Sequence, residues 1–143
     1  MGLTFQRTEK VTGPEADIRH TVFEAEQGFV DEFDEIDNRS IHILASQNSK
    51  AVGVCRIFTE DDPNVYFLGR LAVIKSCRKD GVGRALVQEA EKAALENHAG
   101  QIRLHAQLQA KPFYEKCGYH QEGGLEEEQG CPHVWMVKDL QKE

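Results

Sequence analysis

The chain has 143 residues, of which 40% are hydrophobic and 29% are charged, proportions typical of a globular domain that buries its own core. Its formal net charge of −7 argues against broad electrostatic attraction to nucleic acid or to an anionic membrane. No run approaches the roughly 18 apolar residues of a membrane span, and the N-terminal residues lack the apolar core of a signal peptide. The four cysteines form no C-x-x-C pair, so we expect free thiols. These features predict one cytoplasmic domain over residues 1–143 that binds neither nucleic acid nor membrane.

The N-terminal half predicts one helix among several strands. Alternating Leu3, Phe5 and Arg7 indicate a short first strand. Pro14 suits the first turn of the helix that follows, and apolar residues at helical spacing give this helix one buried face. That face comprises Ile18, Val22 and Ala25. The acidic stretch 31–37 predicts a loop or a broken helical turn. Three further strands are expected at residues 40–46, 51–58 and 65–73, joined by turn-like segments that favour antiparallel pairing.

The C-terminal half adds one long helix, one short helix and the remaining strands. We expect the long helix at 83–97, with Gly100 as its stop, a strand at 101–107, a short helix at 112–117 and a last strand at 134–138, alone or with one further strand. The strands 65–73 and 101–107, joined by the long helix, predict a right-handed parallel βαβ unit. The remaining sheet should be mostly antiparallel. The fold class is therefore mixed α/β (α+β), and not a doubly wound nucleotide fold.

A glycine-rich segment, CRKDGVGRALVQEA, lies between the strand 65–73 and the long helix. Glycine permits positive φ and close backbone approach, and the helix N-terminus adds free N–H groups, so the segment suits a phosphate group. Arg78 and Arg84 supply charge for forked phosphate contacts, and we expect Asp80 to cap the helix. A Walker loop is absent, and Leu86 stands where a dinucleotide fingerprint needs a small residue. On spacing alone, a tight turn carrying solvated basic residues explains the segment equally well.

Two motifs in the correct order narrow this choice. The first, R-x-x-G-x-G, is formed by Arg78, Gly81 and Gly83 after a strand that ends in LAV. The second, A-x-x-F-Y-E-K-x-G-Y, occupies residues 110–119. Together they resemble the acetyl-CoA-binding motif and a downstream segment of the GNAT N-acetyltransferase superfamily. The strings IRHTVFEAEQGF, DEFDEID and GCPHVWM extend the resemblance to the branch of small bacterial GNAT proteins around YjcF and ElaA, so that it covers nearly the whole chain.

The resemblance implies a single GNAT acyl-CoA acyltransferase domain that moves an acetyl group from acetyl-CoA to a primary amine of a small molecule or a protein. The implied coenzyme-binding residues are Leu71, Ala72, Val73, Arg78, Lys79, Asp80, Gly81, Val82, Gly83, Arg84, Ala85, Gln107, Ala110, Phe113 and Tyr114. Tyr114 matches the family's general acid for the coenzyme A sulfur, and a backbone N–H near the end of strand 65–73 is expected to face the thioester oxygen. Direct attack in a ternary complex is implied, because no cysteine stands at the expected nucleophile position.

The base that deprotonates the amine is open at this point. Glu26 is the first candidate and His105 the second, with His133 and His42 behind them, and a water chain without a single base is a further alternative. A carboxylate with an ordinary pKa of about 4.3 is a weak base unless burial raises that pKa.

Three further features complete the sequence-based expectations. The acidic residues Glu32, Asp34, Glu35 and Asp37 are interpreted mainly as a solvated face, and alternatively as an attractant for a cationic acceptor; Arg56 is expected to pair with one of them. Cys131 and His133 are too few for a metal site, so we expect no metal. A non-catalytic acyl-CoA sensor with the same fold is the alternative function, and a homodimer is common in the family.

Overall fold

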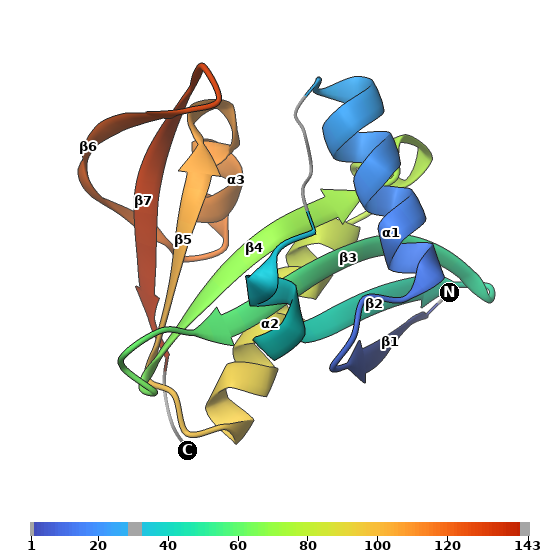
Figure 1. Cartoon of the computed structure of the whole chain (residues 1–143), viewed down its shortest axis with the longest axis horizontal. Coiled ribbons are helices and arrows are strands. Elements are labelled where there is room, and N and C mark those ends of the chain that lie inside the picture. Colours follow the sequence, from blue (N-terminus) through green and yellow to red (C-terminus); the bar gives the residue numbers. More distant parts are fainter. Residues whose placement is uncertain (1, 29–32, 141–143) are drawn as a thin grey trace.

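The computed structural model describes residues 2–28 and 33–140, in which seven strands form one sheet with helices on both faces (Figure 1). The strand order is β1-β2-β3-β4-β5-β7-β6. The strands are β1 (Leu3–Thr8), β2 (Ile41–Gln47), β3 (Lys50–Thr59), β4 (Val65–Val73), β5 (Gln101–Gln107), β6 (His120–Glu128) and β7 (Cys131–Asp139). Within the described sheet every neighbouring pair is antiparallel except β4 and β5, which confirms the predicted mixed fold with its single parallel unit.

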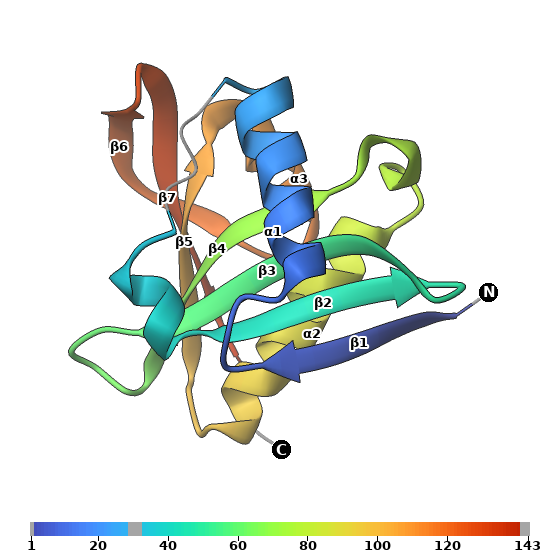
Figure 2. The ribbon, with the colours of Figure 1, turned by 45° about the vertical axis from the view of Figure 1, so that its right-hand side comes forward.

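The two main helices cover opposite faces of the sheet. Figures 1 and 2 show α1 (Gly13–Arg19) across one face and α2 (Val82–Glu96), which connects β4 to β5, across the other. Strand β3 contributes side chains to the cores on both faces of the sheet, because successive side chains of a strand point to opposite faces. Val54 packs with Ile18 and Val22 beneath the N-terminal helix, whereas the next residue, Cys55, belongs to the larger core beneath α2.

The predicted N-terminal helix is present, but its second half is wider than an α-helix. Thr12 caps α1, since its hydroxyl accepts a hydrogen bond from the Glu15 N–H at 3.2 Å. The chain continues as the π-helix η1 (His20–Glu26). A π-helix closes i→i+5 hydrogen bonds, so the 3.6-residue spacing used for the prediction no longer holds there. Ala25, expected on the buried face, is therefore exposed, while Phe23 is half-buried.

The shorter helices also bear on the site. The 3₁₀ helix η2 (Glu35–Arg39) begins within the acidic stretch 31–37, for which a loop or a broken helical turn was predicted; Glu32 lies outside the described residues. Two more 3₁₀ turns, η3 (Lys75–Cys77) and η4 (Leu108–Ala110), follow β4 and β5. The predicted short helix is α3 (Lys111–Lys116). No helix in the described part of the chain is both long and apolar enough to cross a membrane.

The C-terminal hairpin is longer than the sequence indicated. A last strand was expected at 134–138, and β7 begins at Cys131, ahead of Pro132. Its partner β6 had no predicted bounds, because a run containing Gly123, Gly124 and four glutamates shows no alternation of apolar and polar residues. Almost all of β6 is exposed at the sheet edge, so neighbouring β7 rather than core packing determines its conformation.

Candidate active site

The site is created by the divergence of β4 from β5. The two strands pair in parallel only from Val65 to Leu68, opposite Gln101 to Leu104, and then separate (Figure 1). A bulge assists this separation, since Arg56 pairs with Gly69 and Val54 with Ala72, which leaves two β4 residues opposite one residue of β3. A bulge bends its strand and releases backbone groups from the ladder. The sequence did not reveal this bulge, although it did point to this part of β4 as the source of an N–H for the thioester oxygen.

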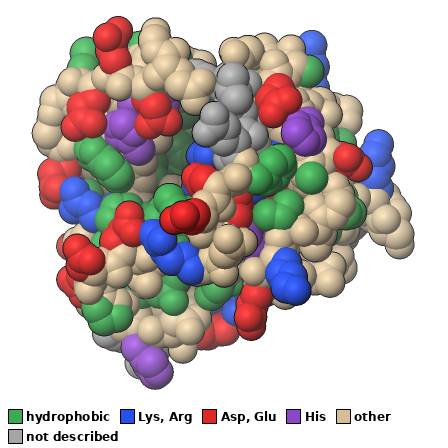
Figure 3. Space-filling view, viewed as in Figure 1, with side chains coloured by type: hydrophobic (Ala, Val, Ile, Leu, Met, Phe, Trp, Pro, Cys, Tyr) green, Lys and Arg blue, Asp and Glu red, His purple; other side chains and the backbone are tan. Residues whose placement is uncertain are grey.

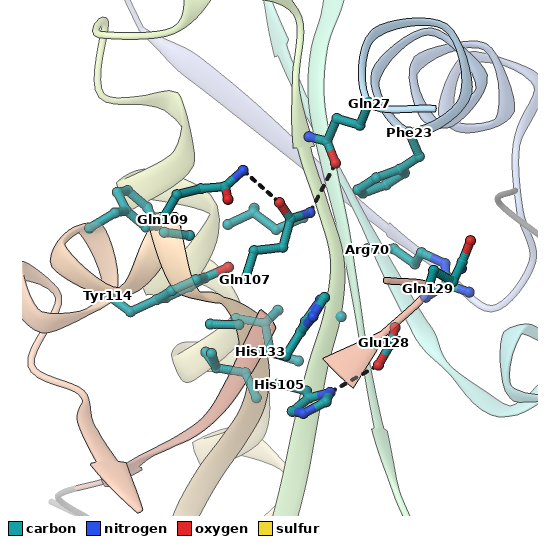
Figure 4. A pocket seen from close by; sticks show the side chains of 17 residues that line it. Phe23, Gln27, Arg70, His105, Gln107, Gln109, Tyr114, Glu128, Gln129 and His133 are labelled. Atoms are coloured by element: carbon teal, nitrogen blue, oxygen red, sulfur yellow. Dashed lines mark hydrogen bonds and ion pairs between the residues drawn. The ribbon is translucent and has the colours of Figure 1, made fainter. Parts of the chain in front are cut away.

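A cavity of about 440 Å³ lies in this split. Figure 4 shows its walls, and Figure 3 shows acidic and histidine side chains gathered over the β5–β6–β7 part of the surface beside the hollow. The lining side chains come from η1, β4, β5, η4, α3, β6 and β7 together with the turn that joins β6 to β7. They include Phe23, Gln27, Arg70, Leu71, His105, Gln107, Ala110, Phe113, Tyr114, Glu128, Gln129 and His133.

The glycine-rich segment lies at the N-terminus of α2, as the sequence predicted. Gly81 is the N-cap residue with φ of +84°, a conformation that favours glycine, and a Cβ at this position would meet no atom within 4 Å. Gly83 has a different role, because a Cβ there would lie 3.2 Å from Phe113 Cζ of α3, which is a tight contact. The expectation that Asp80 caps the helix is wrong: the N-cap residue is Gly81, and no side chain caps this end.

Arg78 is held in place by two contacts. Its Nε donates to the Val73 carbonyl oxygen at 2.9 Å, and its Nη2 lies 2.7 Å from Glu26 Oε1. Glu26 is therefore paired with the arginine expected to contact phosphate, and it is not among the residues that line the cavity. Lys79, Asp80, Gly81 and Arg84 are exposed on the same loop and first helical turn, where the N-terminal N–H groups of α2 provide a general anion site.

Tyr114 is the second feature that the motifs pointed to. Pro112 stands in the first turn of α3, where the N–H that proline lacks would have no partner within the helix. The helix directs Tyr114 into the cavity wall (Figure 4). Its ring contacts Phe113 and Tyr119 edge to face at 4.9 and 6.0 Å between centroids. Burial raises the pKa of the Tyr114 hydroxyl well above its ordinary value, with a smaller contribution from neighbouring thiols. The hydroxyl is therefore protonated over the whole neutral range.

Gln107 lies at the end of β5, where the strands have separated. Its side chain links two other glutamines across the mouth of the cavity: its Nε2 donates to Gln27 Oε1 at 2.9 Å, and its Oε1 accepts from Gln109 Nε2 at 2.8 Å (Figure 4). This row of amides connects the end of the N-terminal helix to the start of η4. Gln107 thus lines the cavity in the β4–β5 split, and its expected contact with the coenzyme stays a prediction.

Two histidine rings line the cavity, and a tryptophan ring packs against one of them. His105 on β5 stacks on Trp135 of β7 at 4.6 Å and lies 4.9 Å from the ring of His133. Two carboxylates flank His105, with Glu128 Oε1 at 2.9 Å from Nδ1 and Glu126 Oε1 at 3.3 Å from Nε2. The candidates His105 and His133 thus come together in this wall, whereas His42 does not line the cavity.

A buried ionic cluster lies beneath α1, on the side of the sheet away from α2. Its most buried members are Glu15, Arg19, Asp37, His42 and Arg56. Asp37 Oδ1 accepts from Arg19 Nη1 at 3.0 Å and from Arg56 Nη1 at 2.8 Å. Burial by itself would raise the pKa of Asp37, but the two guanidinium groups outweigh it and lower that pKa. The expected pairing of Arg56 with the acidic stretch is confirmed, and Asp37 does not belong to a solvated face.

This cluster reaches the cavity through Asp34 and Arg70. Arg56 Nη1 donates to Asp34 Oδ1 at 2.8 Å, and Asp34 Oδ2 lies 3.7 Å from Nη2 of Arg70, which lines the cavity. Asp34 also caps η2, and Arg56 and Arg70 lower its pKa despite partial burial that acts to raise it. Asp34 is thus an ion-pair partner of two arginines. As for metals, among the described residues no group of three or more His, Cys, Asp or Glu could hold a metal ion.

Comparison with known proteins matches this fold. The family model described as an acetyltransferase (GNAT) domain matches residues 12–140. The uncharacterised N-acetyltransferase YjcF of Bacillus subtilis is 39% identical over 125 residues, which cover 85% of this chain and 88% of YjcF. A crystal structure assigned to an N-acetyltransferase of Lactobacillus plantarum has a TM-score of 0.87 and 27% identity, covering 99% of this chain and 100% of that one. The structure of Escherichia coli ElaA has a TM-score of 0.83 and 24% identity, covering 96% of this chain and 99% of that one. The chain therefore belongs to the GNAT acetyltransferases.

Proposed function

We propose that the protein transfers an acetyl group from acetyl-CoA to a primary amine by direct attack within a ternary complex. The observation that carries this proposal is the cavity in the β4–β5 split, which is lined by the two wall histidines and by Phe113, whose ring lies beside Gly83 in the first turn of α2. A coenzyme A thioester needs an anion site for its phosphates and an open space between the strands for its pantetheine chain. An amine acceptor needs a second approach to the same carbon.

The donor side is formed by groups that suit coenzyme A. The open space in front of Gly81 and the helical N–H groups suit a pyrophosphate, and Arg78 and Arg84 add guanidinium groups for charge-assisted contacts. The cavity itself is lined by three more residues of the implied set, Gln107, Ala110 and Phe113. The chemistry of these groups supports the implied set of coenzyme-binding residues.

Tyr114 is proposed as the general acid for the leaving sulfur. When the C–S bond breaks, the thiolate needs a proton, and a hydroxyl held protonated by its raised pKa is available to supply it. The high pKa also makes full proton transfer to a thiolate unfavourable by itself, since a thiol has an ordinary pKa of about 8.5. The transfer is therefore concerted with cleavage of the C–S bond.

The amine must lose a proton before it attacks, because an alkylammonium with a pKa of about 10.4 has no free electron pair. Glu26 is the less suitable base, since its carboxylate is paired with Arg78 and is not among the lining residues. Deprotonation is assigned instead to the imidazole wall of β5 and β7. Direct attack is supported by the described lining residues, none of which is a cysteine.

Two measurements test this proposal in sequence. Titration with acetyl-CoA, followed by calorimetry or thermal shift, should show saturable stabilisation, and the absence of any shift at millimolar acetyl-CoA would contradict it. A panel of primary amines with acetyl-CoA, followed by free-thiol release, should then identify acetylated products. Binding of acetyl-CoA without turnover of any amine would instead favour a non-catalytic acyl-CoA sensor.

A further inference from the structure

His133 is a buried imidazole on β7 that opens onto the cavity. Only 5% of the residue is exposed, and it forms part of the cavity wall. Strand register places it opposite Gln107 on β5 and opposite Glu126 on β6. Figure 4 shows its ring directed toward the middle of the cavity, above the ring of His105.

The hydrogen bond at Nδ1 determines the form of this imidazole. Nδ1 lies 2.9 Å from the carbonyl oxygen of Cys131, and a carbonyl oxygen can only accept, so Nδ1 carries a proton and donates it. In the neutral ring the lone pair is then on Nε2. Among the residues that the structure describes, the buried side-chain nitrogens without a partner are Arg56 Nε and His105 Nε2. His133 Nε2 has no hydrogen-bond partner there either and is not sealed from solvent, so its lone pair faces the cavity.

His105 differs from His133 at both nitrogens. Its Nδ1 is engaged by Glu128 Oε1 at 2.9 Å. Its Nε2 is buried without a hydrogen bond of good geometry, and Glu126 Oε1 lies 3.3 Å away. His105 therefore offers no accessible lone pair to a molecule in the cavity. Its ring fills the space between Trp135 and His133 and supports the position of His133.

We propose that His133 is the catalytic base of this enzyme and that Nε2 takes a proton from the acceptor amine, an assignment that rests on the proposed acetyl transfer. The alkylammonium R–NH₃⁺ gives one proton to Nε2, and the neutral nitrogen forms a C–N bond with the thioester carbonyl carbon. The C–S bond then breaks and its electron pair leaves with sulfur. Tyr114 gives its proton to the sulfur and regains one from the nitrogen. The products are the amide, the coenzyme A thiol and an imidazolium that releases its proton to solvent.

The charges around His133 suit this proton transfer. The titratable and charged groups that face it are His105 from β5, Glu126 and Glu128 from β6, Arg70 from β4 and Tyr114 from α3. The two carboxylates flank His105, next to His133, and are opposite in charge to the imidazolium that forms in the reaction, whereas Arg70 is compensated by Asp34. Imidazole is also the side chain whose ordinary pKa is nearest neutral, where a base works most efficiently.

The test compares two matched variants in the full chain. His133→Asn keeps a side-chain N–H that can donate to the Cys131 carbonyl and removes the nitrogen at the Nε2 position. His98→Asn is the control, because His98 is exposed at the end of α2 with φ of +68°, which asparagine tolerates. Each protein is assayed with acetyl-CoA and the primary alkylamine that the wild type acetylates fastest, from pH 6 to pH 10. The affinity for acetyl-CoA is measured separately by calorimetry.

We expect His133→Asn to lower kcat at neutral pH by about 10²- to 10⁴-fold, with the Kd for acetyl-CoA unchanged. Without the base only the amine already neutral in solution reacts, so the variant's kcat/KM should rise about tenfold per pH unit toward the amine pKa of about 10.4, while the wild type levels off earlier. His98→Asn should match the wild type. A His133→Asn enzyme with wild-type rate and pH profile, or one that loses acetyl-CoA binding, would overturn the assignment.

A second measurement does not depend on turnover. Long-range ¹H–¹⁵N NMR of the histidine side chains in the free protein should show the His133 proton on Nδ1 and an unprotonated Nε2 at neutral pH. A proton on Nε2 would refute the base assignment by itself. If the wild type acetylates no amine, the proposed function fails, and this tautomer measurement alone decides the form of His133.

Discussion

Replacing Glu26 by glutamine should tighten the binding of acetyl-CoA. Glu26 Oε1 lies 2.7 Å from Arg78 Nη2, and under the proposed function the coenzyme phosphates need the same guanidinium. Binding of the coenzyme then breaks this ion pair, and the free energy of the pair is subtracted from the affinity. Glutamine has nearly the same shape as glutamate but carries no charge, so the variant removes mainly this competition.

The expected gain is modest because the pair is partly exposed. The side chains of Arg78 and Glu26 are 39% and 26% exposed, and ion pairs in contact with water contribute about 0.5–1 kcal/mol after screening and side-chain entropy. A tenfold change in Kd corresponds to about 1.4 kcal/mol. The Kd for acetyl-CoA should therefore fall about two- to fivefold in Glu26→Gln.

Isothermal titration calorimetry with acetyl-CoA provides the measurement. Glu24→Gln is the matched control, since Glu24 lies on the same π-helix and pairs with His20, at 3.1 Å from its Nδ1. In an Arg78→Gln background the gain from Glu26→Gln should disappear. An unchanged or weaker affinity, together with a loss of about 100-fold in kcat, would refute this reasoning and make Glu26 the base.

Three further outcomes are expected. Tyr114→Phe should lower kcat by about 10²-fold or more in steady-state assays while leaving the Kd for acetyl-CoA unchanged, and a variant with full turnover would remove Tyr114 as the acid. For His42, burial acts to lower the pKa, but the hydrogen bond with Glu15 and other contacts raise it overall. Because the unfolded value is about 6.5, this stabilisation is complete below pH 6.5 and is lost as the pH rises through the folded value; urea unfolding across this range should show the loss in the wild type and not in His42→Gln. Gly53→Ala should destabilise the fold by about 1–3 kcal/mol, measured as a lower Tm, because its Cβ would lie 2.8 Å from Leu86 Cδ1; an unchanged Tm would show that this core accommodates the methyl group.

Several features near the site were visible in the sequence because they depend on residues close together in the chain. Gly81 supplies positive φ at the start of α2, and Pro112 begins α3; each acts within one turn of the backbone. The parallel βαβ unit followed from the order of its elements and the handedness of such connections. The wrong prediction for the N-terminal helix also had a local cause. The π-helical turn moved Ala25 to the surface and Phe23 toward the cavity, because the spacing used in the prediction assumes 3.6 residues per turn.

The sequence by itself thus determined the family, the order of the elements and the glycine-rich loop that suits a coenzyme. Only the tertiary structure decided which polar groups meet. Glu26 is 52 positions from Arg78 in the numbering, yet the two form an ion pair, and Gln107 donates a hydrogen bond at 2.9 Å to Gln27, 80 positions earlier in the chain. Such contacts are set by strand register, by the bulge in β4 and by the packing of α1 on the sheet. Side-chain periodicity reports which face of an element is buried, but it does not specify which distant partner lies there, and the chemistry of the site depends on those partners.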